Sequence, residues 1–259
     1  MSLNPPIRDW RGQRCWIVGA STGIGAALAE RLAAAGAHLA LSARRREPLE
    51  AMAGRFGSGR SLALPLDIRD ADALAAAART LTASWGGIDV VILMAGDYQP
   101  MRAWEIDLPA ARSMIETNIL GCFNVLAAVT PLLIKQGSGT IALVSSVAGY
   151  RGLPKSLAYG PTKAAIINLA ETLYLDLRSR GIGVCVVNPG FVKTPLTDQN
   201  DFKMPALITA EEAAREIMEG LGRGAFEIHF PRRFTRVLKF LRLLPYRVYF
   251  AAIRRMIGP

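Results

Sequence analysis

The chain has 259 residues, 51% of them hydrophobic, which is enough for one α/β domain with a large core. Its formal net charge of +10 favours an anionic partner, which could be a nucleic acid, a membrane surface or a cofactor. Three cysteines and two histidines are too few for a disulfide framework or a histidine-rich metal site, so we expect reduced thiols, a cytoplasmic protein and no metal.

The N-terminal residues lack the apolar segment of a secretory signal, and we expect no uninterrupted apolar run long enough to span a bilayer. The first predicted strand, Cys15–Ala20, enters a turn with the pattern Gly-x-x-x-Gly-x-Gly, and the helix that follows has its C-cap at Gly36. Glycines let a backbone approach a pyrophosphate, and the amides of a helix N-terminus attract its charge. We therefore predict a phosphate-binding turn at Gly19, Gly23 and Gly25.

The second predicted strand, His38–Ala43, ends where a dinucleotide-binding unit for NAD would carry an acid for the ribose hydroxyls. Three arginines follow instead, at 44–46. An arginine pairs with a 2′-phosphate that an acid would repel, so the sequence predicts NADP(H), with Arg44 as the foremost ligand. The alternative is that these arginines are a solvated start to the helix predicted around 48–56.

The next predicted elements are a strand at Ser61–Asp67, a helix at Ala71–Trp85 and an apolar strand at Ile88–Gly96. Asp67 stands at the end of its strand. Its carboxylate could cap the helix that starts near Asp70, or it could accept a hydrogen bond from the amino group of an adenine. The residues alone leave both alternatives open.

Four polar residues form a candidate reactive group. Asn118 lies among apolar neighbours in a helical stretch at 104–136, where an asparagine is disfavoured unless its amide is bonded or has a function. Tyr159 and Lys163 stand four residues apart on one face of a later helix, and a nearby ammonium lowers the pKa of a phenol. The pair predicts a proton donor and acceptor for a carbonyl or alcohol, whose oxygen Ser146 could hold. The alternative is an ordinary pair on a helix surface.

The remaining predicted elements continue the alternation of strands and helices. They are strands at 140–146, 183–190 and 225–230, and helices at 159–180 and 209–221. A capping box formed by Thr209 and Glu212 starts the last of these helices. The alternation predicts a single Rossmann-like domain over 1–230, with a doubly wound parallel sheet of about seven strands and helices on both faces.

The C-terminal extension, 231–259, contains eight basic residues and no acidic residue. Its apolar residues recur at helical spacing on either side of Pro245, which predicts a basic amphipathic helical tail. Such a tail can lie on the inner face of an anionic membrane, and the alternative is that it packs on the same domain or on a partner subunit over the substrate cleft. No nucleic-acid-binding motif accompanies the charge, so we expect no nucleic acid partner.

Over residues 11–230 these motifs resemble the classical short-chain dehydrogenase/reductase family. The catalytic residues of the family fall on Asn118, Ser146, Tyr159 and Lys163. Ser146 is preferred to Ser145 because the family usually places this serine thirteen residues before the tyrosine. The resemblance implies an NADP(H) site made of Gly19, Ser21, Thr22, Gly23, Ile24, Gly25, Arg44, Asp67, Ile68, Ala95, Gly96, Tyr159, Lys163, Pro189, Gly190, Val192 and Thr194.

The resemblance also implies a reaction, in which a hydride passes between the nicotinamide and a carbonyl or alcohol while Tyr159 moves the proton and Ser146 stabilises the oxygen. Lys163 would hold the nicotinamide ribose and lower the pKa of the tyrosine, and Asn118 would position a water that relays protons. We expect an apolar, lipid-like small-molecule substrate such as a ketone, aldehyde, 3-oxoacyl thioester or sterol, and a homodimer or homotetramer. The alternative is a non-catalytic NADP(H)-binding regulator or a membrane-attached scaffold on the same fold.

One motif departs from the family, which often carries Asn-Asn-Ala-Gly after the fourth strand. The residues here are Leu93, Met94, Ala95 and Gly96. The last two keep the backbone pass beneath the cofactor, but the asparagine amide that ties neighbouring elements together is missing. We therefore expect an effect on local stability or cofactor affinity rather than on catalysis.

Overall fold

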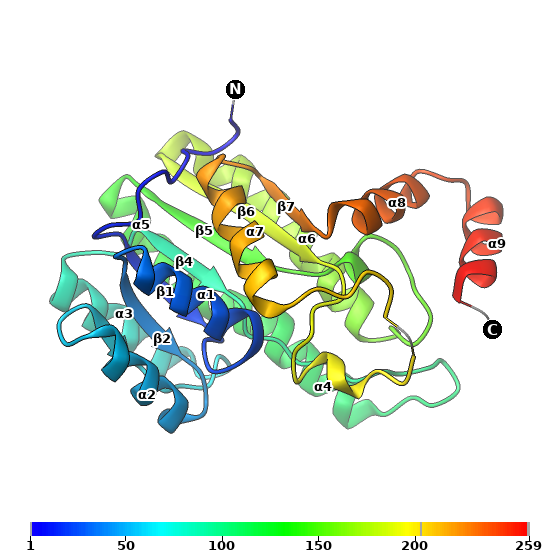
Figure 1. Cartoon of the computed structure of the whole chain (residues 1–259), viewed down its shortest axis with the longest axis horizontal. Coiled ribbons are helices and arrows are strands. Elements are labelled where there is room, and N and C mark those ends of the chain that lie inside the picture. Colours follow the sequence, from blue (N-terminus) through cyan, green and yellow to red (C-terminus); the bar gives the residue numbers. More distant parts are fainter. Residues whose placement is uncertain (1, 203, 258–259) are drawn as a thin grey trace.

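The structure is a computed structural model that describes residues 2–202 and 204–257. Its centre is a sheet of seven parallel strands in the order β3-β2-β1-β4-β5-β6-β7 (Figure 1). The strands are β1 (Arg14–Val18), β2 (His38–Ser42), β3 (Ser61–Ala63), β4 (Val90–Leu93), β5 (Gly139–Val144), β6 (Ile182–Pro189) and β7 (Glu227–Phe230). This sheet confirms the predicted doubly wound α/β fold.

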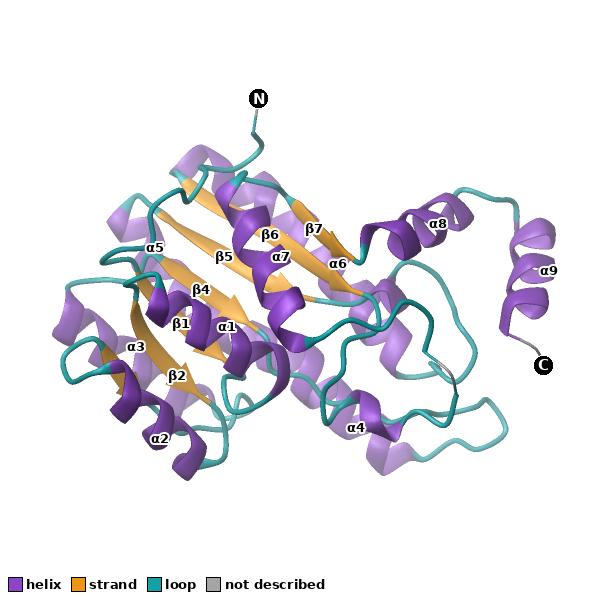
Figure 2. Ribbon diagram, viewed as in Figure 1, coloured by secondary structure: helices purple, strands orange, loops and turns teal. Residues whose placement is uncertain are grey.

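Helices cover both faces of the sheet (Figure 2). One layer holds α1 (Gly23–Ala34), α2 (Arg46–Phe56) and α7 (Ala210–Gly222), and the other holds α3 (Ala71–Trp85), α5 (Gly121–Gln136) and α6 (Tyr159–Leu177). The other helices are α4 (Leu108–Ile115), the π-helical turn Glu116–Leu120, the 3₁₀ turns Val147–Gly149, Arg178–Arg180 and Thr197–Gln199, α8 (Arg232–Arg242) and α9 (Tyr246–Ile257).

The strands are apolar along their length because each is covered on both faces. Successive residues of β1 show this, since Trp16 packs in the core beneath α3, α5 and α6 while Ile17 packs in the core beneath α1, α2 and α7. Both side chains are fully buried, and a buried side chain of this size contributes about 1.5–3 kcal/mol. The sheet therefore separates two apolar cores and leaves its edges for polar groups.

Local signals set several element boundaries. Asp70 is the N-cap of α3, where its carboxylate accepts a 2.9 Å hydrogen bond from the Ala73 amide, so the cap is Asp70 and not Asp67. The predicted capping box at Thr209 is present at the start of α7. The third strand ends at Ala63, four residues earlier than predicted, although the amides of Leu64 and Leu66 still donate to the Leu41 and Ala43 carbonyls.

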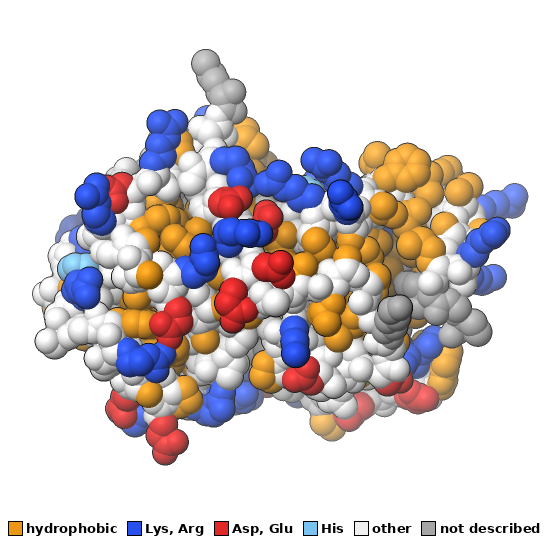
Figure 3. Space-filling view, in the orientation of Figure 1, with side chains coloured by type: hydrophobic (Ala, Val, Ile, Leu, Met, Phe, Trp, Pro, Cys, Tyr) orange, Lys and Arg blue, Asp and Glu red, His pale blue; other side chains and the backbone are white. Residues whose placement is uncertain are grey.

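The C-terminal extension packs on the same domain through one side of α8 and α9. Leu238, Leu241, Tyr249 and Ile253 are buried in the core on the α6 side of the sheet. The opposite side of these two helices is exposed and carries apolar side chains next to blue basic ones in the space-filling view (Figure 3). Packing on the domain, one of the alternatives for this segment, therefore uses only part of its apolar surface.

The apolar helical stretch Leu108–Gln136, which joins α4, the π-helical turn and α5, is long and apolar enough to cross a membrane by length and composition alone. The expectation excluded only an uninterrupted apolar run, and polar residues such as Asn118 and Asn124 interrupt this stretch. A buried core helix passes the same test, and Val125, Val129 and Leu133 of α5 are fully buried against the sheet. We therefore treat this stretch as a core helix.

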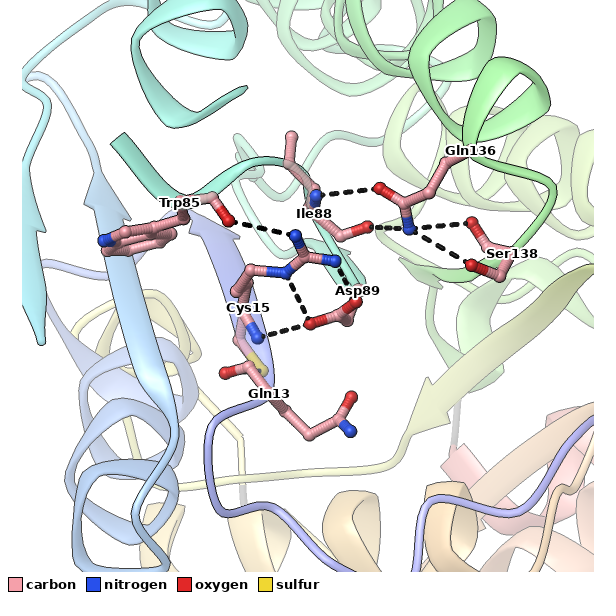
Figure 4. A network of polar contacts seen from close by, with 8 residues as sticks. Gln13, Cys15, Trp85, Ile88, Asp89, Gln136 and Ser138 are labelled. Carbon is pink, nitrogen blue, oxygen red and sulfur yellow. Dashed lines mark hydrogen bonds and ion pairs between the residues drawn. The ribbon is translucent and has the colours of Figure 1, made fainter. Parts of the chain in front are cut away.

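The amino-terminal edge of the sheet is closed by a polar network (Figure 4). Arg14 forms an ion pair with Asp89 at 2.5 Å, and its guanidinium also donates to the Trp85 carbonyl at the end of α3. The side chain of Gln136, at the end of α5, accepts from the Ile88 amide at 3.2 Å and donates to the Ile88 carbonyl at 3.0 Å. These contacts hold the starts of β1 and β4 to the ends of two helices.

Candidate active site

The carboxyl edge of the sheet carries a cavity of about 1000 Å³. It lies beside the point where the strand order reverses between β1 and β4, which is where open parallel sheets bind ligands. The cavity extends from Arg44, after β2, to Tyr159 on α6. Every residue predicted to contact NADP(H) lines it, as does Ser146, whereas Asn118 lies outside the lining.

The turn between β1 and α1 requires glycine for reasons of space. Gly19 has a φ of 106°, and a Cβ there would overlap the amide nitrogen of Ala95. A Cβ on Gly25 would overlap the Gly19 carbonyl, and one on Gly23 would come within 2.9 Å of the Thr194 side chain. Gly19 therefore lets the turn close on the chain after β4, Gly25 lets the turn fold on itself, and Gly23 leaves room for Thr194.

The N-terminus of α1 is open to an anion. Its N-cap residue, Thr22, makes no side-chain capping bond, and the first turn contains no acidic residue. The first amides of a helix carry partial positive charge and need acceptors. These residues fit the pyrophosphate of a dinucleotide, because the backbone supplies donors and the glycines supply room.

The far end of the cavity carries both signs of charge. Arg44 is exposed and lines the cavity beside Ala43. The Asp67 carboxylate accepts from the Arg69 amide at 2.9 Å and pairs with the Arg69 guanidinium at 2.6 Å, and these bonds lower the pKa of Asp67. Asp67 is therefore engaged with Arg69 rather than with α3, while its contact to an adenine stays a prediction.

The departure at Leu93 and Met94 leaves the backbone connection intact. The amides of Met94 and Ala95 both donate to the Val18 carbonyl at 2.8 Å. The end of β4 is thereby tied to the end of β1 through main-chain bonds, without an asparagine side chain. Gly96 follows, and a Cβ there would lie 3.5 Å from both the Asn118 amide oxygen and the Lys163 Nζ.

The two adjacent serines after β5 have different surroundings. Ser145 is buried, and its hydroxyl donates to the Lys163 carbonyl at 2.7 Å, so it joins β5 to α6. The Ser146 hydroxyl accepts from the Ala148 amide at 3.1 Å and is hydrogen-bonded to Tyr159. Only Ser146 is thus placed beside the tyrosine hydroxyl at the cavity wall.

Burial dominates the electrostatics of Tyr159 and Lys163. It raises the pKa of Tyr159 to about 12, against a lowering effect of the Ser146 hydrogen bond. Burial also lowers the pKa of Lys163 to about 8. The Lys163 Nζ donates to the Val144 carbonyl at 3.1 Å and lies 5.5 Å from the centre of the tyrosine ring. The expected lowering of the tyrosine pKa is not found in this structure, because burial raises it and the opposing effect comes from Ser146 rather than from Lys163.

Asn118 supports the site from behind. It lies in the π-helical turn before α5 and is 1% exposed. Its amide oxygen accepts from the Asp97 amide at 2.7 Å, and its amide nitrogen donates to the Asp97 carbonyl at 2.9 Å and to the Thr162 hydroxyl at 3.1 Å. The side chain therefore joins the chain after β4 to α6, and its role in positioning a water stays a prediction.

Several residues at the substrate end were not predicted from the sequence. The Tyr98 ring packs edge-on against Tyr159, with ring centres 4.8 Å apart, and its hydroxyl donates to the Asn200 side chain at 2.7 Å. Phe191 packs against Phe202 and against Phe234 of α8, at 5.6 and 5.8 Å between ring centres. These contacts join segments that are far apart in the chain, so no local sequence motif predicts them.

Comparisons with known proteins agree with this geometry. A family model described as short chain dehydrogenase matches residues 13–204. An uncharacterized oxidoreductase of Myxococcus xanthus is 35% identical over 242 residues, which are 93% of this chain and 96% of that protein.

Two solved structures share the fold. A short chain dehydrogenase of Burkholderia cenocepacia in complex with NADP is 26% identical, with a TM-score of 0.83 and coverage of 97% of this chain and 100% of that chain. A short chain dehydrogenase/reductase of Burkholderia phymatum in complex with NAD is 21% identical, with a TM-score of 0.82 and coverage of 90% and 94%. The glycine turn, the serine and tyrosine at the cavity wall and the match over most of the sequence lead to one conclusion: the chain belongs to the short-chain dehydrogenase family.

Proposed function

We propose that the protein is an NADPH-dependent reductase of apolar carbonyl compounds. The observation that carries this proposal is that one cavity joins Arg44 at one end to Ser146 and Tyr159 at the other. The two ends are three strand spacings apart, because β2, β1, β4 and β5 are neighbours in the sheet and each spacing is about 4.8 Å. An extended dinucleotide fits this span with its phosphates at the glycine turn.

Coenzyme choice follows from the residues after β2. Ala43 offers no carboxylate to ribose hydroxyls, and Arg44 offers a fixed positive charge to a 2′-phosphate. When bound, NADPH supplies the hydride. Lys163 and Thr194 also line the cavity and would hold the nicotinamide half.

The proton side of the reaction is assigned to this chain's own residues. The Tyr159 hydroxyl, whose high pKa keeps it protonated at neutral pH, donates its proton to the carbonyl oxygen of the substrate. The Ser146 hydroxyl donates a hydrogen bond to the same oxygen as negative charge develops there. Lys163 is charged at neutral pH, and its ammonium near the tyrosine ring stabilises the phenolate that is left.

The proposed substrate class is supported by aromatic side chains near the cavity. The Tyr98 ring packs on Tyr159, and Phe191, which lies between the lining residues Gly190 and Val192, packs against Phe202 and against Phe234 of α8. Apolar rings beside the cavity favour an apolar substrate with a single polar group, its carbonyl.

Exposed apolar residues on α5 and α6 support a homodimer or homotetramer. Phe123 is 50% exposed and Leu175 is 76% exposed. Sedimentation of the purified protein tests this assembly, and Phe123→Ser should shift the distribution toward monomer. A monomer at all concentrations would contradict it.

The coenzyme assignment is tested by titrating the protein with NADPH and with NADH. Arg44→Ala should weaken NADPH binding by about 10- to 100-fold, the range of a charged hydrogen bond, and leave NADH binding unchanged. Arg46→Ala is the matched control, because Arg46 is adjacent and exposed but pairs with Glu50 at 3.1 Å and does not line the cavity. Preference for NADH in the unmodified protein would contradict the assignment.

The reductase activity is tested by following NADPH oxidation with a panel of apolar ketones and aldehydes. Tyr159→Phe should lower the rate by about 10²- to 10⁴-fold while NADPH still binds. Equal rates in the two proteins would remove Tyr159 from the reaction. Tight NADPH binding without turnover of any carbonyl would favour a non-catalytic regulator.

A further inference from the structure

The outward side of the C-terminal helices is an exposed apolar surface. We call it the tail face, and its exposed apolar residues are Val237, Phe240, Leu243, Tyr246, Val248, Phe250 and Met256. Phe240 is 63% exposed and Leu243 is 80% exposed. In Figure 3 hydrophobic side chains gather over α8 and α9, at the end of the molecule away from β2. A surface of this kind on a folded protein marks an interaction site.

The tail face is also strongly basic. The extension carries eight basic residues and no acidic residue. Arg232 and Lys239 form ion pairs with Glu216 and Glu227 of the domain. Within residues 2–202 and 204–257, the remaining six basic residues of the extension form no salt bridge. These are Arg233, Arg236, Arg242, Arg247, Arg254 and Arg255. Their charge is available to an external anion.

The elbow between α8 and α9 is fixed to the domain by Arg151. Its guanidinium donates to the Leu241 carbonyl at 3.2 Å and to the Leu244 carbonyl at 2.7 Å, which are at the end of α8. It also lies over the rings of Tyr246 and Tyr249, at 4.6 and 4.1 Å from their centres. The tail face is therefore already ordered, so binding a partner would not include the free-energy cost of folding these helices.

We propose that the tail face binds the surface of an anionic lipid bilayer. Exposed aromatic and aliphatic side chains enter the interfacial region, and surrounding arginines pair with lipid phosphates. A symmetric contact between two tail faces would bring the six positive charges without a salt bridge in the described part of one copy close to the six of the other, which opposes self-association. Charge complementarity therefore selects an anionic surface over a second copy of this chain.

The geometry sets how the protein would sit on the bilayer. α8 starts where β7 ends, at the carboxyl edge of the sheet, and its Phe234 packs on Phe191 at the substrate end of the cavity. The tail face is thus next to the substrate side, and α8 and α9 lie at the opposite end of the molecule from β2 (Figure 1). This inference does not depend on the proposed reductase activity, because lipid binding needs no turnover.

The test is co-sedimentation of the full-length protein with vesicles. Vesicles of phosphatidylglycerol mixed with phosphatidylcholine are compared with vesicles of phosphatidylcholine alone. We expect binding to the anionic vesicles only. Binding should weaken as the salt concentration rises from 0.1 M to 1 M, because the screening length falls from about 10 Å to about 3 Å.

Two paired variants locate the surface. Arg254→Glu with Arg255→Glu should lower the partition coefficient by at least about 25-fold, since each basic residue near an anionic surface contributes about fivefold. Arg8→Glu with Arg79→Glu removes the same net charge from exposed positions of the domain body and should have a much smaller effect. Phe240→Ser with Leu243→Ser tests the apolar contribution and should also weaken binding. NADPH titration of each variant verifies that it is folded.

Several results would overturn the proposal. These are no binding to anionic vesicles, equal binding to neutral ones, or equal losses in the tail and body charge variants. Loss of self-association in the Phe240→Ser and Leu243→Ser variant, with vesicle binding unchanged, would instead assign the tail face to a second copy of the chain.

Discussion

The two edges of the sheet use similar polar residues for opposite purposes. At the amino-terminal edge, Arg14 and Asp89 bond each other and Gln136 bonds both polar groups of the Ile88 backbone, so the charges and amides there are paired. At the carboxyl edge, the N-terminus of α1 has no side-chain cap and Arg44 is exposed on a cavity of about 1000 Å³. The first edge holds the fold together, and the second leaves donors for a ligand.

This difference between the two edges predicts which variants should lose stability and which should lose binding or activity. A change at the amino-terminal edge should lower stability and leave the activity of the folded protein unchanged. A change at the carboxyl edge should lower binding or turnover whether or not it also lowers stability, because the groups there are left for a ligand.

The largest expected effect is at the glycine turn. Gly25→Ala places a Cβ on the Gly19 carbonyl, so the turn must move and the phosphate site is lost. We expect coenzyme affinity to fall by more than about 100-fold and stability to fall by about 1–3 kcal/mol, the cost of overpacking. Fluorescence titration with NADPH and thermal unfolding measure the two quantities.

A second helical glycine provides the control. A Cβ on Gly54 of α2 meets nothing within 4 Å, so Gly54→Ala should keep coenzyme affinity and raise stability by about 0.5–1 kcal/mol. Equal coenzyme affinity in the two variants would show that the turn at Gly25 is not part of the binding site.

Much of the fold could be predicted because its signals are local. The predicted helix at Ala71–Trp85 matches α3 to the residue, since Asp70 caps its start and Gly86 adopts a left-handed conformation at its end. The third strand was predicted four residues too long, because the apolar pattern continues to Leu66 while β3 ends at Ala63. The helix carries signals for its start and its end in its own sequence, whereas the apolar pattern of the strand does not mark where regular pairing stops.

In the site, too, the parts with local sequence signals could be predicted and the contacts between distant segments could not. The glycine turn and Arg44 are continuous with predicted elements, and the structure brings them to one cavity with Tyr159. Tyr98 and Asn200 could not be predicted as neighbours, because their hydrogen bond spans 102 residues. The direction of the Tyr159 pKa was also beyond the sequence, since it depends on how completely the surrounding residues exclude water.

Lys163 should show how a buried charge at the carboxyl edge of the sheet lowers the free energy of unfolding. Burial lowers its pKa from 10.5 to about 8, so between these values the unfolded chain holds a proton that the folded protein has lost. The contribution of this group to stability therefore rises with pH across that window, by about 3 kcal/mol in all. Relative to Lys163→Met, which lacks the titration, the unmodified protein should gain stability from pH 8 upward. Denaturant unfolding at each pH measures this difference, and a difference independent of pH would contradict the assignment.

Asp89 tests the opposite edge. Burial raises its pKa, but the Arg14 hydrogen bonds outweigh burial and hold the pKa below its ordinary value of 3.8. Asp89→Asn should lower the free energy of unfolding by about 2 kcal/mol, the value of a charged hydrogen bond, and leave NADPH affinity unchanged. The ion pair's contribution is present above the ordinary pKa and is lost as the pH falls through the lower one, so the two proteins should converge in acid. If Asp89→Asn instead lost coenzyme affinity and kept its stability, the proposed difference between the two edges of the sheet would be contradicted.

A change at Tyr98 should give the smallest effect, because this residue contributes both to stability, through its hydrogen bond, and to the site, through its contact with Tyr159. Tyr98→Phe keeps the ring that packs on Tyr159 and removes only the 2.7 Å hydrogen bond to Asn200, so we expect a loss of about 1 kcal/mol in stability and a higher KM for the carbonyl substrate. Tyr174→Phe is the matched control, because it removes a 3.1 Å hydrogen bond to the Leu3 carbonyl, and Tyr174 packs on Phe226 rather than on Tyr159. Both variants should lose similar stability, and only Tyr98→Phe should change KM. The same KM in both would show that the segment holding Asn200 does not shape the substrate site, because the one bond that ties it to Tyr98 would then have no effect on substrate binding.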